Sequence, residues 1–390
     1  MPLRARDRPG ARPGARAHRR IRVALAGQWK DRLGDDPMTD PDRAAASTGA
    51  PPASGRRSSF WVVLPLALFV LAGLGWTAAW FYAAGRAEKE IDSWIANEAA
   101  AGRQWSCADR RLTGFPFRFE LICAQPSVTF TGADPWQWSA GRAHAVAQVW
   151  NPQHIIAEFQ GPSVLKEPAS GRSIEANWSL LQVSAVGSGG VVDRVSTSAN
   201  DYVLSEGGKP LFFARHAELH ARHHPGADGN TLDIAMGVKA AGSGALNGGS
   251  QATADGELQA TITQVPPFQA MPVAERLRLW QQAGGTVNIA VGKLAAGGGM
   301  MNATGDISLD AQRRPNGTLT VAVANPQGLL GALGGSGLLP EQANTLLPLL
   351  MAAGQPTSID GTKASGFPFV FRDGRVALGF IPLGKVGPLY

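Results

Sequence analysis

An uncharged run of 25 residues, FWVVLPLALFVLAGLGWTAAWFYAA, occupies positions 60–84 and constrains this chain more than any other feature. As an α-helix it would be about 37 Å long at ~1.5 Å per residue, longer than the ~30 Å hydrocarbon layer of a bilayer. Trp61 at one end and Trp80 and Tyr82 at the other are typical of the two interfaces between lipid and water. The run therefore predicts a transmembrane helix over 60–84 rather than a buried helix of a soluble core.

Flanking charges predict the orientation of this helix. Arg56 and Arg57 precede it, whereas the residues that follow mix Arg86 and Lys89 with two glutamates. Positive charge is favoured on the cytoplasmic side, so the N-terminus is expected there and the rest of the chain on the other side. The run is longer than the ~7 to 15 apolar residues of a cleavable signal, which favours an uncleaved anchor.

The basic charge of the chain belongs to its N-terminal tail. The formal net charge is +6, and residues 1–37 carry ten Lys and Arg against four Asp, which accounts for all of it. A nucleic-acid-binding face on the remainder has no support. Residues 1–59 are expected to be a disordered cytoplasmic tail, with Met38 as a candidate start of translation. A basic RNA-binding arm or a transit peptide is the alternative for the stretch before Met38.

The remainder of the chain predicts a mainly β protein. A helical stalk is expected over 85–104, followed by one β-rich body over 105–390 with alternating apolar residues and turn signals. Charged residues are 17% and glycines number 48, which suits a large, curved, mostly antiparallel sheet with many turns. Helical periodicity appears only in short stretches, at 272–282 and 342–353, so two or three short helices are expected.

A short motif, Gly-Phe-Pro-Phe, occurs twice in the body. Its copies consist of Gly114, Phe115, Pro116 and Phe117, and of Gly366, Phe367, Pro368 and Phe369. Glycine permits a tight turn, proline does not continue a helix, and the alternating Phe residues resemble one buried face of a strand. Both copies are therefore predicted to be structural, starting strands that enter a shared core, rather than to bind a ligand.

The two cysteines of the chain, Cys107 and Cys123, flank the first motif copy. In an oxidising compartment they would close a loop worth about 3 kcal/mol in the loop-entropy model. Reduced buried thiols or a metal pair are the alternatives, although no nearby histidine completes a zinc set.

The strongest candidate for chemistry lies at 211–224, where His216, Glu218 and His220 would share one face of a strand. Side chains two residues apart on a strand are ~7 Å apart, so one metal ion would need ligands from neighbouring strands. A solvated polar face is the other interpretation. No catalytic residue and no cofactor is predicted, because the known nucleotide and hydrolase motifs do not occur in their structural context.

Tryptophans are dense in the first part of the body and just before it. They are Trp94, Trp105, Trp136, Trp138, Trp150 and Trp178. Packing in the core or near the membrane is one explanation, and an apolar groove for acyl chains or a protein partner is the other.

Several of these features together resemble a known family. Trp105-Ser106-Cys107, the first Gly-Phe-Pro-Phe, Cys123 and the final VALGFIPLG at 376–384 resemble the alphaproteobacterial domain of unknown function 2125. This resemblance implies a single-pass inner-membrane protein with a periplasmic body, and it implies no activity. The general architecture is also similar to AsmA-type envelope proteins, whose curved sheets are associated with lipid handling, but architecture does not fix function.

Two alternative functions are therefore expected for this chain. The first is a non-enzymatic role in envelope maintenance, in which the β body binds lipid or acyl chains or scaffolds envelope proteins beside the inner membrane. The second is a periplasmic hydrolase or metal-binding protein that uses the face with His216, Glu218 and His220.

Overall fold

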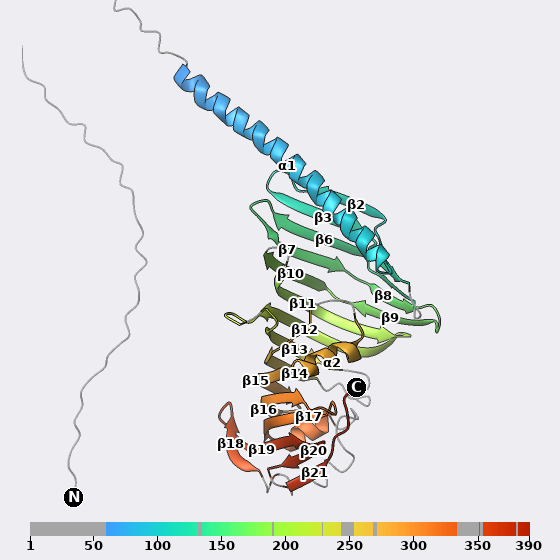
Figure 1. The fold of residues 1–390 in the computed structure, drawn as a ribbon, viewed down its shortest axis with the longest axis vertical. Helices are drawn as coiled ribbons and strands as arrows, with labels where there is room; N and C mark the ends of the chain where they lie inside the picture. The colour runs from blue at the N-terminus through green and yellow to red at the C-terminus, as the bar shows by residue number, and fades with distance from the viewer. Residues whose placement is uncertain are drawn as a thin grey trace, which may run out of the picture. The chain divides into compact units, whose positions relative to one another are not determined.

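A computed structural model describes residues 60–390, except 132–134, 189–190, 228, 243–252, 268–270, 334–350, 352–353 and 380. The expected tail at 1–59 and its Met38 start lie outside the described residues, and so does the expected helix at 342–353. The remainder consists of one long helix, a large antiparallel sheet and two short helices (Figure 1). The predicted mainly β fold class is confirmed.

The first element is the 41-residue helix α1 (Phe60–Ala100). An 18-residue stretch of its apolar part has a mean hydropathy of 2.1 and is not buried inside the protein, so α1 is long and apolar enough to cross a membrane. Trp80 and Ala84, towards the end of the apolar part, are buried. Arg86 forms an ion pair with Glu90 one turn further along. The apolar run and the expected stalk are thus one continuous helix, which ends four residues before the expected position 104.

Twenty-one strands form a single hydrogen-bonded sheet. Their bounds are β1 (Arg103–Ser106), β2 (Asp109–Thr113), β3 (Arg118–Ala124), β4 (Ser127–Phe130), β5 (Trp136–Ser139), β6 (Arg142–Gln148), β7 (Asn151–Gln160), β8 (Ser163–Glu167), β9 (Arg172–Asn177), β10 (Leu180–Ser188), β11 (Val191–Glu206), β12 (Lys209–His223), β13 (Leu232–Ala241), β14 (Ala254–Ile262), β15 (Thr286–Ala296), β16 (Gly299–Leu309), β17 (Pro315–Ala324), β18 (Gln355–Ile359), β19 (Thr362–Arg372), β20 (Arg375–Leu378) and β21 (Ile381–Lys385).

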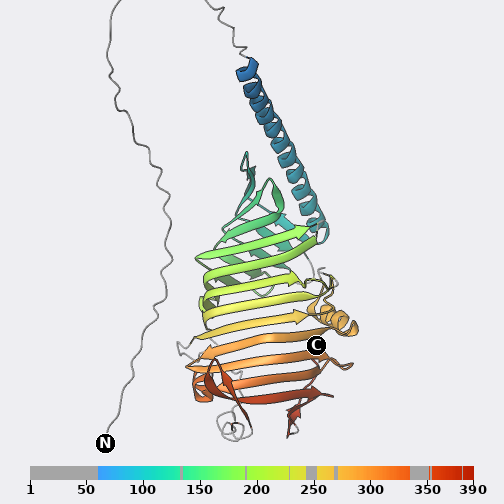
Figure 2. The same ribbon diagram turned by 90° about the vertical axis from the view of Figure 1, so that its left-hand side faces the viewer.

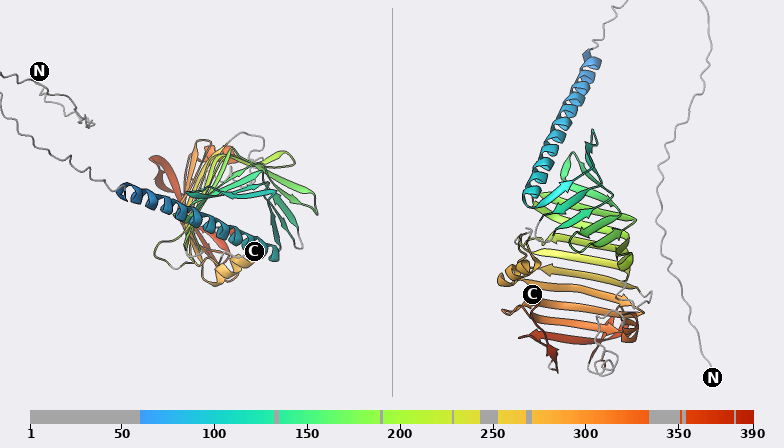
Figure 3. Two further views of the ribbon diagram at one scale, coloured as in Figure 1. Left: turned by 90° about the horizontal axis from the view of Figure 1, so that it is seen from above. Right: turned by 90° about the vertical axis from the view of Figure 1, so that its right-hand side faces the viewer.

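Neighbours in sequence are neighbours in the sheet from β10 to β17, and β19, β20 and β21 continue the same series (Figure 2). All pairings are antiparallel. The sheet is not closed into a barrel, and the view from above in Figure 3 shows its curvature. Short turns therefore account for most of the topology.

The sheet forks at the 16-residue strand β11. The N-terminal part of β11 pairs with β10, from which one branch runs through β7, β6 and β3 to β2. Its C-terminal part pairs with β9, from which a second branch runs through β8, β5 and β4 to β1. The two branches thus end on β2 and β1, which follow each other along the chain.

Two short helices accompany the sheet. The helix α2 (Val273–Gln282) begins after Pro272 and ends before Gly284, within the range expected from its periodicity. The helix α3 (Pro326–Leu333) lies outside the two stretches, 272–282 and 342–353, in which helical periodicity was found. Leu329 of α3 packs on Ala296 at the end of β15, and this contact stabilises a helix with little propensity of its own.

The two Gly-Phe-Pro-Phe copies differ from the prediction and from each other. In the first copy, residues 114–117 form the turn between β2 and β3, and its rings are largely exposed. In the second copy, residues 366–369 lie inside β19 rather than at its start, with Phe367 buried. The predicted strand start was therefore wrong for both copies, and the common buried face was wrong for the first copy, because its phenylalanines lie in a turn.

Candidate functional site

One face of the sheet is apolar along a continuous row of paired residues. Directly paired residues of antiparallel strands lie on the same face, so a row can be followed from strand to strand through the register. The central row contains Leu112, Leu121, Ala145, Ala157, Val183, Thr197, Leu219, Met236, Leu258, Gly292, Ala303, Val321 and Phe367. It crosses thirteen strands, from β2 to β19, with Thr197 as its one polar side chain.

The rows on either side of the central row are apolar as well. One contains Phe119, Ala147, Ile155, Ala185, Val195, Ala221, Ile234, Ala260, Ile289, Gly305, Leu319, Phe369 and Leu378. The other lies between two polar residues, Arg110 of β2 and Ser365 of β19, and contains Cys123, Ala143, Phe159, Leu181, Ala199, Ala217, Val238, Gly256, Leu294, Met301 and Val323. We call these three rows together the apolar face.

The opposite face of the same strands is mostly polar. The row that alternates with the central one contains Ile122, His144, Glu158, Gln182, Ser198, Glu218, Gly237, Glu257, Lys293, Asn302 and Ala322. The strands are therefore amphipathic, with one face suited to water and the other to an apolar phase.

Much of the apolar face is open in the described part of the chain. Leu219 and Met236, which pair across β12 and β13, are 43% and 44% exposed, and Ile155 on β7 is 44% exposed. The helix α3 packs over one end of the face, where Met301 and Val323 contact the small buried cluster around Leu329. Large apolar side chains that stay accessible over several strands indicate a binding surface rather than a closed core.

A cavity of about 1030 Å³ adjoins the apolar face. Val195 and Ala221 of the apolar face form one wall, and Leu279 and Ala283 of the α2 region line the cavity as well. Its size is at the upper end of the ~300–1,000 Å³ range of small-molecule pockets. Trp280 fixes α2 in place, since its Nε1–H donates to the carbonyl of Thr263 at 2.8 Å.

A carboxylate near this cavity is ionised and fully partnered. Asp233 contacts Nδ1 of His224 at 2.8 Å and accepts hydrogen bonds from Thr261 and Arg222. Burial disfavours its charged form, but these three partners together outweigh burial and hold the pKa of Asp233 below its usual value. An acid with this environment does not suit proton transfer near neutral pH.

The predicted chemical candidates lie on the polar face. The Nε2 atoms of His216 and His220 lie 3.7 Å and 3.5 Å from Oε2 of Glu218, and all three side chains are well exposed. Nδ1 of His216 instead contacts Oδ1 of Asn200 at 2.8 Å. No group of three or more His, Cys, Asp or Glu that could hold a metal ion occurs among the described residues. This geometry matches a solvated polar face.

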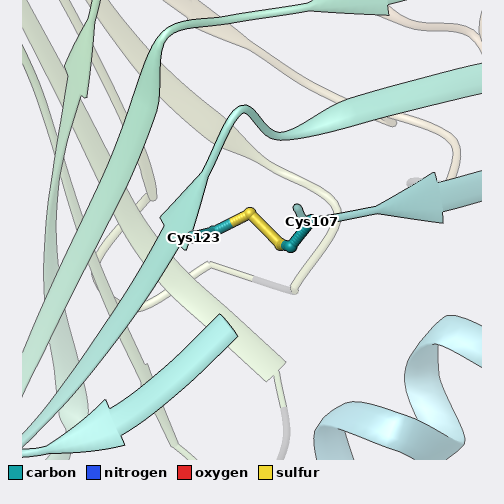
Figure 4. Close-up of a disulfide and its surroundings, with 2 residues drawn as sticks. All are labelled: Cys107 and Cys123. Carbon is teal, nitrogen blue, oxygen red and sulfur yellow. A yellow bond between two sulfur atoms is a disulfide. The ribbon is translucent and has the colours of Figure 1, made fainter. Parts of the chain in front are cut away.

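The two cysteines form a disulfide, with their Cα atoms 5.5 Å apart (Figure 4). Cys107 directly follows β1, and Cys123 belongs to β3 and to the apolar face. Because β1 ends one branch of the fork and β3 pairs with the terminal strand of the other, the disulfide links the free ends of the two branches.

The tryptophans near this link serve packing. Trp105 lies between Trp94 and Trp138, with ring centroids at 5.4 Å and 6.1 Å. Trp138 donates to the hydroxyl of Ser163, and Trp178 donates to the carbonyl of Phe159. Trp150 is 65% exposed, in the turn between β6 and β7. They thus connect α1, the second branch and the edge of the apolar face.

Most of the chain matches the model of one protein family. The model of an uncharacterised protein family conserved in bacteria, DUF2125, matches residues 80–387. The chain belongs to the DUF2125 family. Neither curated proteins nor solved structures match it significantly. DUF2125 membership supports the predicted resemblance and assigns no activity, while the architectural similarity to AsmA-type proteins stays a prediction.

The apolar face was not predicted as a continuous surface from the sequence. Each strand shows some alternation, but many positions of the face are Ala or Gly, which weakens the pattern. The rows become visible only when the register of all strands is known. The signal that could have indicated them is the run of uncharged residues at alternate positions within single strands, such as 143–147, 155–159 and 181–185.

Proposed function

We propose that this protein is anchored by α1 in the inner membrane and that its periplasmic β body binds the acyl chains of membrane lipids along the apolar face. The body carries lipid and catalyses no reaction. The observation that carries the proposal is the register itself, which places three adjacent apolar rows on one face of an open sheet.

The dimensions of the apolar face suit acyl chains. Thirteen strands at ~4.8 Å spacing give the central row a length of about 58 Å. One leaflet contributes about 15 Å to a ~30 Å hydrocarbon layer, so the face could accept several chains in sequence. Burial of apolar area is worth roughly 25 cal/mol per Å², and it needs no directional partner.

The position of the first strands favours a bilayer as the source of lipid. Phe119, the first member of one apolar row, stacks on Trp80 of α1 with ring centroids 5.5 Å apart. Trp80 also donates from Nε1 to the carbonyl of Arg118 at 3.2 Å. The apolar face therefore begins in contact with the apolar part of α1, which supports transfer of an acyl chain between the two.

The test is native mass spectrometry of the full-length protein extracted in mild detergent, together with quantification of co-purified phospholipid. The wild type is expected to carry lipid. A double variant, Leu219→Lys and Met236→Lys, places two charges in the middle of the apolar face and is expected to lose at least about tenfold in bound lipid, which corresponds to ~1.4 kcal/mol.

A control places one lysine on the other face, and the single variant Leu219→Lys is its counterpart on the apolar face. Gln259 pairs with Ala235 on the polar face and is exposed, so Gln259→Lys is expected to retain lipid at the wild-type level. Equal lipid content in the double variant and the wild type, with both folded by circular dichroism, would rule out the proposal.

The hydrolase or metal-binding alternative gains no specific support. Its candidates, His216, Glu218 and His220, are exposed on the polar face, and no further ligand joins them among the described residues. Retained zinc in the wild type that is lost in a His216→Ala, His220→Ala variant would revive it.

A further inference from the structure

The turn between β2 and β3, residues 114–117, lies against the apolar part of α1. The Nε1–H of Trp76 donates to the carbonyl of Pro116 at 2.9 Å. The ring of Phe115 stacks on Phe81 with centroids 5.7 Å apart and meets the edge of Trp80 at 5.5 Å. This turn contains the first Gly-Phe-Pro-Phe copy, whose residues do not belong to the apolar face.

The contact with Trp76 fixes the level of the turn along α1. Trp76 lies sixteen residues after Phe60, about 24 Å along the helix axis, and ten residues before Arg86, the first charge on that side, about 15 Å further. A hydrocarbon layer of ~30 Å that starts near Phe60 ends close to Trp80. Pro116 therefore lies at a level where α1 itself is suited to lipid.

Three of the four carbonyl groups of the turn have hydrogen-bond partners. The carbonyl of Gly114 accepts from the N–H of Arg118 at 3.1 Å, and that of Phe117 accepts from the N–H of Val149 at 3.1 Å. Pro116 has no N–H, and its carbonyl accepts from Trp76. Unsatisfied backbone groups cost several kcal/mol in hydrocarbon, so irregular backbone is tolerated there only when its polar groups are paired.

The side chains around the turn are large, apolar and accessible. Phe115 is 47% and Phe117 60% exposed, and on α1 Phe81 is 61% and Tyr82 78% exposed. The nearest charge in the turn region, Arg118, is level with Trp80 and forms an ion pair with Glu120. Aromatic rings next to paired charges are typical of the interface between lipid and water.

We propose that the β2–β3 turn is a membrane wedge, in which Phe115 and Phe117 insert into the leaflet of the bilayer nearest the β body and hold the start of the apolar face at the lipid surface. The occupant of this surface is the leaflet that α1 crosses, because the turn and the apolar run of α1 are in direct contact. The inference rests on the part of the proposed function that makes α1 a membrane anchor, and it does not require lipid binding by the sheet.

The test uses full-length protein in nanodiscs of zwitterionic and anionic phospholipid. Single cysteines are introduced by Phe117→Cys, Val70→Cys or Ser358→Cys and labelled with an environment-sensitive fluorophore, while the native disulfide remains closed. Quenching is then measured with phospholipids that carry a nitroxide on an acyl chain. Val70 reports on the anchor, and Ser358, exposed on β18, reports on the body.

Quenching at position 117 is expected within about twofold of that at position 70, with a preference for a nitroxide near the headgroup, because the turn lies near one boundary of the hydrocarbon layer. Position 358 is expected to show no quenching. If 70 is quenched while 117 behaves like 358, the wedge is wrong and the anchor stands. If 70 is not quenched, the anchor and the wedge are both wrong.

A second pair of variants separates insertion from folding. Phe117→Leu keeps an apolar side chain, whereas Phe117→Asp brings a charge to the hydrocarbon. Because Phe117 is 60% exposed, neither variant should change the stability of the folded state much. With the label at position 115 through Phe115→Cys, the Asp variant is expected to lose at least about half of the quenching that the Leu variant keeps. Equal quenching in both variants would contradict the wedge.

Discussion

The two Gly-Phe-Pro-Phe copies have almost the same sequence and lie in opposite environments. Gly114 starts a turn with φ +104°, and the rings that follow are exposed beside α1. Gly366 lies inside β19 between β17 and β18, and Phe367 is only 6% exposed. The difference shows that flanking strands, rather than the motif, decide whether these phenylalanines face protein or the surroundings.

The largest effect is expected for the buried ring. Phe367→Ala removes a side chain from the end of the central apolar row and should lower the free energy of unfolding by about 3–5 kcal/mol. Phe115→Ala loses aromatic contacts worth roughly 1 kcal/mol, because the ring is half exposed. Thermal unfolding of both full-length variants in the same detergent measures the difference between their losses of stability. Equal losses of stability would mean that the two copies are equivalent.

Only the first copy is enclosed by a disulfide, because Cys107 and Cys123 lie on either side of residues 114–117. A Cys107→Ser, Cys123→Ser variant should lose about 3 kcal/mol of stability, because the unfolded chain regains the freedom of a loop of 16 residues. Reduction of the wild type should bring its melting temperature to that of the variant, which itself should not respond to reductant. A response of the variant would show that reductant acts elsewhere.

The glycines of the two copies should tolerate a methyl group differently. In Gly114→Ala the new Cβ would come within 2.6 Å of the carbonyl oxygen of Arg118 at a positive φ, which is expected to cost about 1–3 kcal/mol. In Gly366→Ala the nearest atom is 3.5 Å away, so the change should lie within about 0.5 kcal/mol or stabilise β19 slightly. Chemical denaturation of the pair measures this difference.

The smallest effect is a pH dependence of the contact between the end of α1 and β1. Arg103 of β1 donates to both oxygens of Glu98 in α1, at 2.5 Å and 2.7 Å, and these hydrogen bonds lower the pKa of Glu98. A lowered pKa in the folded state stabilises the protein above the usual glutamate pKa and ceases to do so as the pH falls through the folded value. The gap in melting temperature between wild type and Glu98→Gln should therefore be present at neutral pH and vanish in acid. A gap that persists in acid would mean that Glu98 acts through packing.

Features set by local periodicity could be predicted from the sequence. The apolar run at 60–84, the hairpin around 143–159 and the helix α2 each depend on residues close in the chain, and the structure contains all three. The sequence Asn151-Pro152 favours a turn at these two residues, but the turn of the hairpin falls at Val149-Trp150. Pro152 instead enters β7 at a register irregularity, where no ladder hydrogen bond from its nitrogen is required.

Features that depend on distant partners could not be predicted. The interval 173–185 has one alternating pattern, yet the chain leaves β9 and enters β10 around Trp178, and the two strands belong to different branches of the fork. The helical state of α3 depends on the contact of Leu329 with Ala296. The apolar face requires the register of thirteen strands, which no local pattern contains.

An open sheet of this size leaves unpaired edges, and both C-terminal edge strands carry a proline. Pro356 lies in β18 and Pro382 in β21. Among the described strands, β18 pairs only with β19 and β21 only with β20. Proline cannot donate a ladder hydrogen bond, so a further strand from another molecule would meet a missing donor at each edge. The described edges of the sheet can thus stay free of further strands without promoting edge-to-edge assembly into fibres.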